Sequence, residues 1–243
     1  NLSLDAWLPS DGKTNRPLVV VVHGGGWIGG DKADEHRQQI ATTLVQDGFV
    51  VASVNYSLAP DQVFPQPVTD IQAAIAWLRE PAQVAAFGTD PAHIAALGDS
   101  SGGNLVGLVG TMGDGPLDQG SRVAAVVSLS GPMSFEVDLA TGGSAPSILR
   151  YLGCTDEANC PNLTLASPVH YVDPTDPPFL LVNGTEDTTV TTLQVEEMGK
   201  ALDAAGVEHE DLVIPGPLHG SYLMHDPLVV DDVLAFLHTR LGS

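Results

Sequence analysis

The sequence predicts an α/β fold, in which a mostly parallel, twisted sheet carries helices on both faces. Apolar segments of strand length alternate along the chain with longer segments of helical periodicity. Strands that are apolar on both sides need cover on both faces, which the intervening helices can supply. With 243 residues, 43% of them apolar, the chain can form a hydrophobic core without metal or disulfide support. We therefore expect a single domain over residues 1–243.

The predicted strands are short apolar runs bounded by glycine, proline or polar residues. Leu2, Leu4, Ala6 and Leu8 recur at every second position, as in a strand with one buried face. The other strands are nearly continuous apolar runs, at 18–22, 49–56, 92–98, 123–131, 178–184 and 208–216.

The predicted helices lie between these strands. Pro67 opens one of them, and Ile71, Ile75 and Leu78 then share one face. The helices are expected at 34–47, 67–78, 101–112, 189–205 and 227–240. Residues 132–177 are rich in Pro, Gly and Ser, and we interpret them as an excursion of loops and short helices within the domain.

Charge excludes several classes of partner. Thirty acidic residues against nine basic ones give a net charge of −21. Such a protein repels phosphate backbones and anionic lipid surfaces, so neither nucleic acid nor a membrane is expected as a partner. No apolar run approaches the ~18 residues of a membrane span, and no signal peptide is visible at the start of the chain.

Two cysteines, Cys154 and Cys160, lie six positions apart in a polar stretch. A reduced, unrelated pair is one interpretation, and a local disulfide, which the spacing favours, is the other. Such a bridge would contribute roughly 2 kcal/mol and would indicate a secreted, periplasmic or otherwise extracellular protein. A zinc site is not expected, because no second His/Cys pair offers the two remaining ligands.

A candidate nucleophile follows the strand at 92–98. Residues 98–102, GDSSG, fit G-x-S-x-G, and they stand between a predicted strand and a predicted helix. That context puts Ser100 on a sharp turn at a helix N-terminus, where free N–H groups favour negative charge. An ordinary glycine-rich turn is the simpler alternative. Ser101 is the competing nucleophile, but it lacks the symmetric glycine flanks.

A candidate anion-stabilising loop follows the strand at 18–22. In residues 23–27, HGGGW, three consecutive glycines leave backbone N–H groups uncovered, as a site that holds negative charge on a carbonyl oxygen requires. A phosphate-binding loop is the rival interpretation, but neither G-x-x-x-x-G-K-[ST] nor G-x-G-x-x-G occurs. A flexible loop without function is the third. We expect His23 to anchor the loop.

The candidate general base is His219. It follows the last predicted strand, in a loop beside Gly220 that would let the ring project into a site. His225 instead precedes Asp226 and resembles a helix start. The remaining histidines lie in the glycine loop, in predicted helices or strands, or in the excursion, at His23, His36, His93, His170, His209 and His238.

The candidate acid follows the strand at 178–184. Both Glu186 and Asp187 stand there, and a carboxylate at this place can accept the imidazole N–H and stabilise the imidazolium. We favour Asp187, although a helix N-cap is a common alternative use of such a residue. The resulting chain order is Ser100, Asp187, His219, each just after a predicted strand.

With these motifs in order, the sequence resembles the α/β-hydrolase esterases and lipases with an HGGG loop, in particular the hormone-sensitive-lipase-like and feruloyl/acetyl esterase group. The resemblance covers HGGGW (23–27), residues 54–78, GDSSGGN (98–104), NGTEDTTV (183–190) and PLHG (217–220). It implies an α/β-hydrolase fold whose oxyanion hole is made by the backbone N–H groups of Gly25, Gly26 and Ser101. The chain begins close to the family's second strand, and residues 132–177 are too few for a large cap domain, which favours an open, shallow site.

The expected activity is that of a serine carboxylic-ester hydrolase on short-chain or aryl/acetyl esters, through an acyl-enzyme and without any cofactor. The partner would be a small-molecule ester, whose alcohol part can be a carbohydrate. Trp27 and Tyr222, beside the catalytic loops, are candidates for substrate contact or for packing. The alternatives are an amidase or peptidase with the same triad and, from another class, a catalytically silent binding module on this fold.

Overall fold

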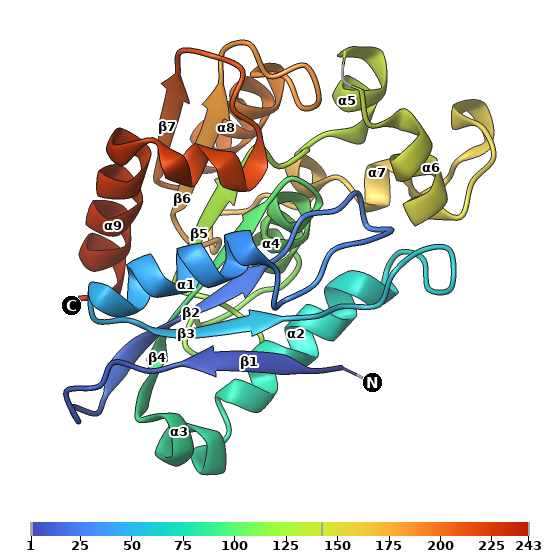
Figure 1. Cartoon of the computed structure of the whole chain (residues 1–243). Helices are drawn as coiled ribbons and strands as arrows, with labels where there is room; N and C mark the ends of the chain where they lie inside the picture. Colours follow the sequence, from blue (N-terminus) through green and yellow to red (C-terminus); the bar gives the residue numbers. More distant parts are fainter. Residues whose placement is uncertain (1, 142, 243) are drawn as a thin grey trace.

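A computed structural model describes residues 2–141 and 143–242 and shows one seven-stranded sheet in the described part of the chain (Figure 1). The strand order is β1-β3-β2-β4-β5-β6-β7, and all neighbouring pairs are parallel except β1 with β3. The strands are β1 Leu4–Trp7, β2 Arg16–Val22, β3 Val50–Val54, β4 Thr89–Asp99, β5 Ala125–Leu129, β6 Phe179–Gly184 and β7 His209–Ile214. The mostly parallel α/β architecture is thereby confirmed. The predicted domain limits at residues 1 and 243 lie outside the described residues.

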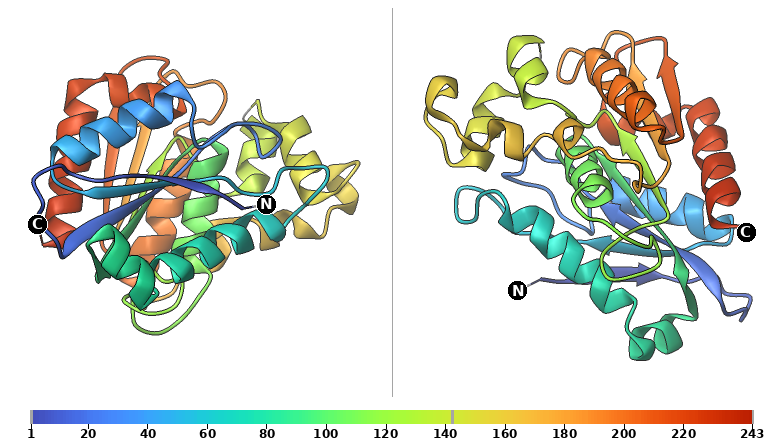
Figure 2. Two further views of the ribbon diagram at one scale, coloured as in Figure 1. Left: turned by 60° about the horizontal axis from the view of Figure 1, so that its bottom comes forward. Right: turned by 180° about the vertical axis from the view of Figure 1, so that it is seen from behind.

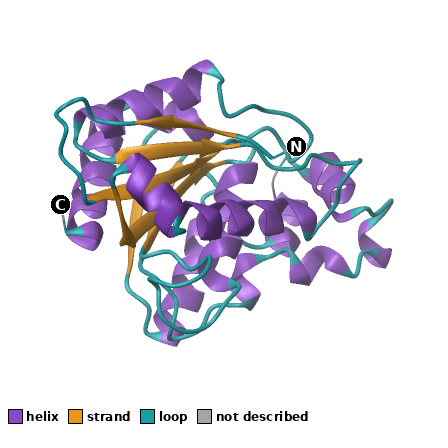
Figure 3. Cartoon of the chain, turned by 90° about the horizontal axis from the view of Figure 1, so that it is seen from below, coloured by secondary structure: helices purple, strands orange, loops and turns teal. Residues whose placement is uncertain are grey.

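Helices cover both faces of the sheet, as Figures 2 and 3 show. The helices are α1 Glu35–Gln46, α2 Gln66–Leu78, α3 Pro81–Phe87, α4 Ser101–Thr111, α5 Phe135–Thr141, α6 Ala145–Leu152, α7 Asn162–Leu165, α8 Leu193–Ala205 and α9 Pro227–Leu241, with short 3-10 turns η1 Glu157–Asn159, η2 Pro168–His170 and η3 Gly220–His225. None of the helices in the described ranges has the length and apolar character needed to cross a membrane.

Alternate residues of β2 divide the core into two layers. Val20 and Val22 pack with α2, α4 and α8 on one face. Val19 and Val21 pack with α1 and α9 on the other. All four valines are fully buried. This two-sided burial is why the sequence shows a continuous apolar run there instead of alternation.

Two helices differ from the sequence prediction. Helix α3 was not predicted, because none of its residues is buried and it therefore carries no apolar stripe. It begins with Pro81 and ends at Gly88, which is left-handed with φ 66°. Helix α8 begins at Leu193 rather than 189, because the preceding residues form a turn on the side chain of Asp187.

The excursion between β5 and β6 contains short helices, α5, α6 and α7, of seven, eight and four residues. A disulfide joins Cys154 at the end of α6 to Cys160 at the end of η1. Residues of this excursion also close the core, since Phe135 and Tyr151 are fully buried. The excursion is too small for a cap domain, in agreement with the expectation from the sequence.

The disulfide gives a first testable prediction. Replacing both Cys154 and Cys160 by serine should lower the free energy of unfolding by about 2 kcal/mol, because the bridge restricts a short loop in the unfolded chain. Chemical denaturation of the oxidised protein and the variant measures the difference. Non-reducing mass spectrometry of the parent protein should find it two hydrogen atoms lighter than the dithiol. A dithiol mass, or identical stability of the two proteins, would contradict this role.

Candidate active site

Ser100 occupies the sharp turn between β4 and α4. Its φ of 51° lies in the left-handed region, which is unusual for a serine and marks a strained turn. Both flanking glycines are required by close backbone approach. A Cβ on Gly98 would lie 2.3 Å from the carbonyl oxygen of Gly102, and a Cβ on Gly102 would lie 2.3 Å from that of Val22. The turn is fixed further by a 2.8 Å hydrogen bond from the Ser100 N–H to the Leu129 carbonyl.

His219 connects Ser100 to Asp187. Its Nε2 lies 3.0 Å from Ser100 Oγ, and its Nδ1 lies 2.6 Å from Asp187 Oδ2. The ring comes from the loop after β7, whereas the carboxylate comes from the loop after β6. The structure thus brings together, at the carboxyl edge of the sheet, three residues that are up to 119 positions apart in the chain.

Asp187 is held in place by its surroundings. Its second oxygen, Oδ1, accepts hydrogen bonds from the N–H groups of Thr189 (2.9 Å) and Val190 (3.1 Å). Burial of the side chain opposes ionisation, but the hydrogen bond and charge of His219, together with these two N–H donors, outweigh it and lower the pKa of Asp187. Glu186, the alternative acid, is exposed. Asp187 therefore serves both purposes: Oδ1 caps the turn, and Oδ2 orients the imidazole.

The glycine loop lies against Ser100. A Cβ on Gly24 would lie 3.2 Å from Ser100 Cβ, so the two segments are in contact. Gly25 and Gly26 have φ of 125° and 63°, and in the described part of the chain their N–H groups meet no acceptor. The N–H of Ser101, at the first position of α4, has no helical acceptor either. These three groups can donate to an oxygen that carries negative charge.

Asp99 joins the parts of this site, a role that the sequence reasoning missed. Its Oδ1 accepts from the Gly24 N–H (3.0 Å) and from the guanidinium of Arg37, and its Oδ2 accepts from the Ser221 N–H (3.3 Å). The glycine loop, α1 and the loop of the base are therefore fastened to one buried carboxylate. One feature of the sequence could have indicated this role: Arg37 falls on the otherwise apolar, buried face of α1, where a charged side chain needs an acidic partner.

His23 anchors the glycine loop, as expected. Its buried ring stacks on Tyr56 at 4.4 Å, and its Nδ1 lies 2.8 Å from the Gly24 carbonyl oxygen. Burial lowers the pKa of His23. His225, the other base considered, lies with its Nε2 3.2 Å from Gln39 Oε1.

The two aromatic candidates differ in their surroundings. Trp27 as a substrate contact is corrected: its side chain is 1% exposed and stacks on Tyr151, with Phe135 at its edge, so it packs in the core. Tyr222 lies on η3, three residues after His219, and is 50% exposed. Its ring meets the edges of His36 and His225, and half of it remains accessible to a ligand.

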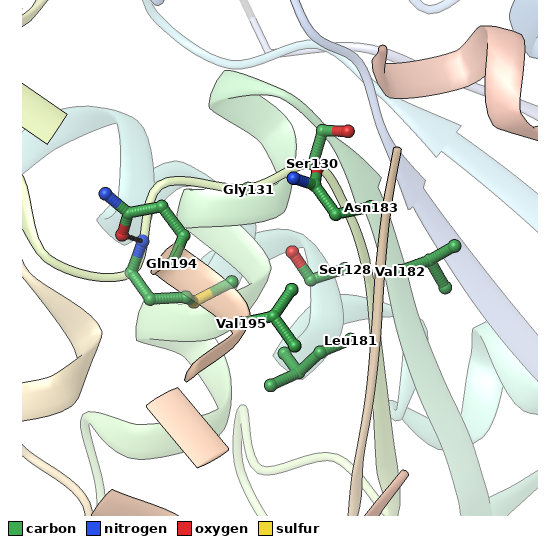
Figure 4. Close-up of a pocket in the computed structure, with 9 residues that line it drawn as sticks. Ser128, Ser130, Gly131, Leu181, Val182, Asn183, Gln194 and Val195 are labelled. Carbon is green, nitrogen blue, oxygen red and sulfur yellow. Dashed lines mark hydrogen bonds between the residues drawn. The ribbon is translucent and has the colours of Figure 1, made fainter. Parts of the chain in front are cut away.

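A small cavity lies between the ends of β5 and β6 and helix α8 (Figure 4). Ser128, Asn183 and Gln194 contribute polar side chains to its wall, beside Leu181 and Val195. Its volume of about 10 Å³ is that of about one water and excludes an ester. Gln194 Oε1 accepts hydrogen bonds from the N–H groups of residues 133 and 134, both 2.8 Å, which ties the excursion to α8. No group of three or more His, Cys, Asp or Glu side chains in the described ranges could hold a metal ion.

The chain is similar in sequence to known esterases and to one family model. The sequence model of the BD-FAE family matches residues 4–202. Esterase LipC of Mycobacterium tuberculosis is 31% identical over 238 residues, which cover 91% of this chain and 57% of LipC. Esterase LipQ of the same organism is 29% identical, over 84% of this chain and 50% of LipQ. The chain thus spans about half the length of these curated relatives.

Solved structures agree with the fold. A bifunctional GH43-CE protein of Bacteroides eggerthii superposes with a TM-score of 0.86 and 28% identity, covering 98% of this chain and 36% of that one. A truncated carbohydrate esterase from gut microbiota superposes with a TM-score of 0.80 and 26% identity, covering 99% of this chain and 91% of its own.

Proposed function

The chain belongs to the BD-FAE family, and from that premise we propose that it is a serine carboxylic-ester hydrolase with Ser100 as nucleophile, His219 as general base and Asp187 as the orienting acid. The observation that carries the proposal is the unbroken line of hydrogen bonds from Ser100 Oγ through the imidazole to Asp187. Esterases among the relatives support it.

In the first half of the reaction, Ser100 Oγ attacks the ester carbonyl carbon while its proton passes to His219 Nε2. Asp187 accepts the Nδ1–H, holds the tautomer and stabilises the imidazolium. The carbonyl oxygen becomes an oxyanion, which the N–H groups of Gly25, Gly26 and Ser101 would receive. Loss of one such donor typically costs about 3 kcal/mol in the barrier.

The second half removes the acyl group. The imidazolium returns its proton to the departing alcohol oxygen, which leaves an acyl-enzyme on Ser100. Water then gives a proton to His219 and attacks the acyl carbon, and collapse of the second oxyanion releases the acid and restores the serine hydroxyl. Every proton in these steps moves through His219 Nε2, so apart from the ester and one water the steps use only groups of the chain.

The substrates we propose are short-chain or aryl/acetyl esters, including esters of carbohydrates. The short helices of the excursion support a shallow site, which suits a small acyl group better than a long one. The carbohydrate part is supported by the name of one structural neighbour, a carbohydrate esterase from gut microbiota. The disulfide supports a location outside the reducing cytosol, and hence secretion.

A kinetic profile over acyl length tests the substrate class. We expect the kcat/KM to stop rising beyond p-nitrophenyl butyrate, so that the palmitate is no better a substrate, because a shallow site leaves the further CH₂ groups in water and gains none of the about 0.8 kcal/mol that each buried CH₂ contributes. Methyl ferulate, an acetylated xylan oligosaccharide and butyryl p-nitroanilide complete the series. Highest activity on palmitate would overturn the substrate class. Faster cleavage of the anilide than of the matched ester would favour an amidase, and no turnover at all would favour a binding module.

A further inference from the structure

Asp138 is a buried carboxyl group close to the site that the mechanism above does not use. It lies in the middle of α5, and its side chain is 0% exposed. Neither of its oxygens has a hydrogen-bond partner in the described part of the chain. Burying a carboxyl group without a partner is costly, and such groups concentrate at functional sites.

Helix α5 is fastened to the turn that carries Asp187. The Gly143 N–H (3.1 Å) and the Ser144 hydroxyl (3.3 Å) both donate to the Thr189 carbonyl, just beyond the C-terminal end of α5. Thr189 in turn donates its N–H to Asp187 Oδ1. At the other end of α5, Gln194 holds the backbone of residues 133 and 134. Figure 1 shows α5 beyond the ends of β5 and β6, with the loop before α8 reaching toward it.

The charged groups that act on Asp138 belong to the candidate site. Burial raises the pKa of Asp138 to about 6; the Ser144 hydroxyl, which lies near the carboxyl group but donates to the Thr189 carbonyl, and the charge of His219 oppose this rise, and the charge of Asp187 adds to it. The Glu136 carboxylate, on the same helix, is instead bonded to Thr164 and His170. The other charged side chains on elements packed against α5 are Arg150 on α6 and Glu196, Glu197, Lys200 and Asp203 on α8.

We propose that Asp138 is a second carboxylate of the catalytic site, a positioning residue whose negative charge stabilises the imidazolium of His219 during the reaction. This inference rests on the proposed function. Asp138 neither gives nor takes a proton in the reaction. Asp187 aligns the ring through its hydrogen bond, whereas Asp138 acts on the ring only by its charge, which its buried, low-dielectric setting leaves poorly screened.

The test is the pH dependence of kcat/KM for p-nitrophenyl butyrate in the parent protein and in Asp138→Asn. Asp138 loses its proton as the pH rises through about 6. The rate ratio of parent to variant should therefore be close to 1 below pH 5 and rise to about 3- to 10-fold above pH 7. The matched control is Glu136→Gln, a carboxylate-to-amide change on the same helix, for which we expect a ratio that does not change with pH.

To separate this role from a structural one, the kcat/KM at each pH is divided by the folded fraction that circular dichroism measures at that pH, because the stability of a protein and its variant can depend on pH differently. Asp138→Ser gives a second, smaller side chain for the same measurement. A constant ratio in both variants, whatever its size, would overturn the proposal. Absence of ester hydrolysis in the parent protein would instead refute the proposed function.

Discussion

Replacing Ser100 by alanine is expected to lower kcat/KM for p-nitrophenyl butyrate by about 10⁴-fold or more. The substitution removes the oxygen that lies 3.0 Å from His219 Nε2, so no acyl-enzyme can form. Steady-state kinetics with a short-chain ester measure the loss. Thermal unfolding should show a folded protein, because alanine keeps the Cβ and removes only a hydroxyl.

Ser101→Ala is the matched control, since Ser101 is the competing nucleophile. Its hydroxyl is buried and lies 3.4 Å from the hydroxyl of Tyr56, and among the described residues no histidine nitrogen is hydrogen-bonded to it. Alanine at 101 keeps the backbone N–H that would serve the oxyanion. We expect this variant to lose no more than about tenfold in kcat/KM. Equal losses in the two variants, or a larger loss in Ser101→Ala, would remove Ser100 from its proposed role.

The second large effect is expected for Asp187→Asn, with a loss of about 10³- to 10⁴-fold in kcat. The carboxylate accepts from His219 Nδ1 at 2.6 Å, and its lowered pKa keeps it ionised at neutral pH. An amide in its place can turn its NH₂ group toward the ring, which favours the wrong tautomer and no longer stabilises the imidazolium. The kcat for p-nitrophenyl butyrate measures the effect.

Glu186→Gln is the control for the acid, because Glu186 is the exposed neighbour with the same charge. We expect its kcat to stay within about twofold of the parent. Equal losses in Glu186→Gln and Asp187→Asn would mean that catalysis depends on the total charge of the loop and not on the hydrogen bond from His219. That outcome would contradict the assignment of the acid.

The sequence predicted the fold well, because parallel strands that are buried on both faces appear in the sequence as continuous apolar runs. The runs at 18–22 and 92–98 became β2 and β4, and the end of β4 carries Ser100 as the G-x-S-x-G context demands. Helix α3 escaped prediction, because an exposed helix has no periodicity to find.

The site was predictable where a residue type and its position after a strand define the chemistry. Ser100, Asp187 and His219 meet these conditions and lie within hydrogen-bond distance in the structure. Asp99 and Asp138 could not be found in this way, because their roles depend on tertiary contacts. Asp99 contacts Arg37 of α1, and the segment that follows Asp138 and α5 is bonded to the turn after β6. Trp27 was ambiguous for the same reason, since burial decides whether a tryptophan beside a loop packs or binds.

Covalent labelling tests the central claim most directly. A fluorophosphonate reacts with an activated serine, whose oxygen bonds to phosphorus as fluoride departs. We predict that the folded protein takes up one phosphonyl group, that peptide mass spectrometry locates it on Ser100, and that ester hydrolysis is lost in proportion to labelling. No label, or a label on another serine of a protein that remains fully active, would contradict the account.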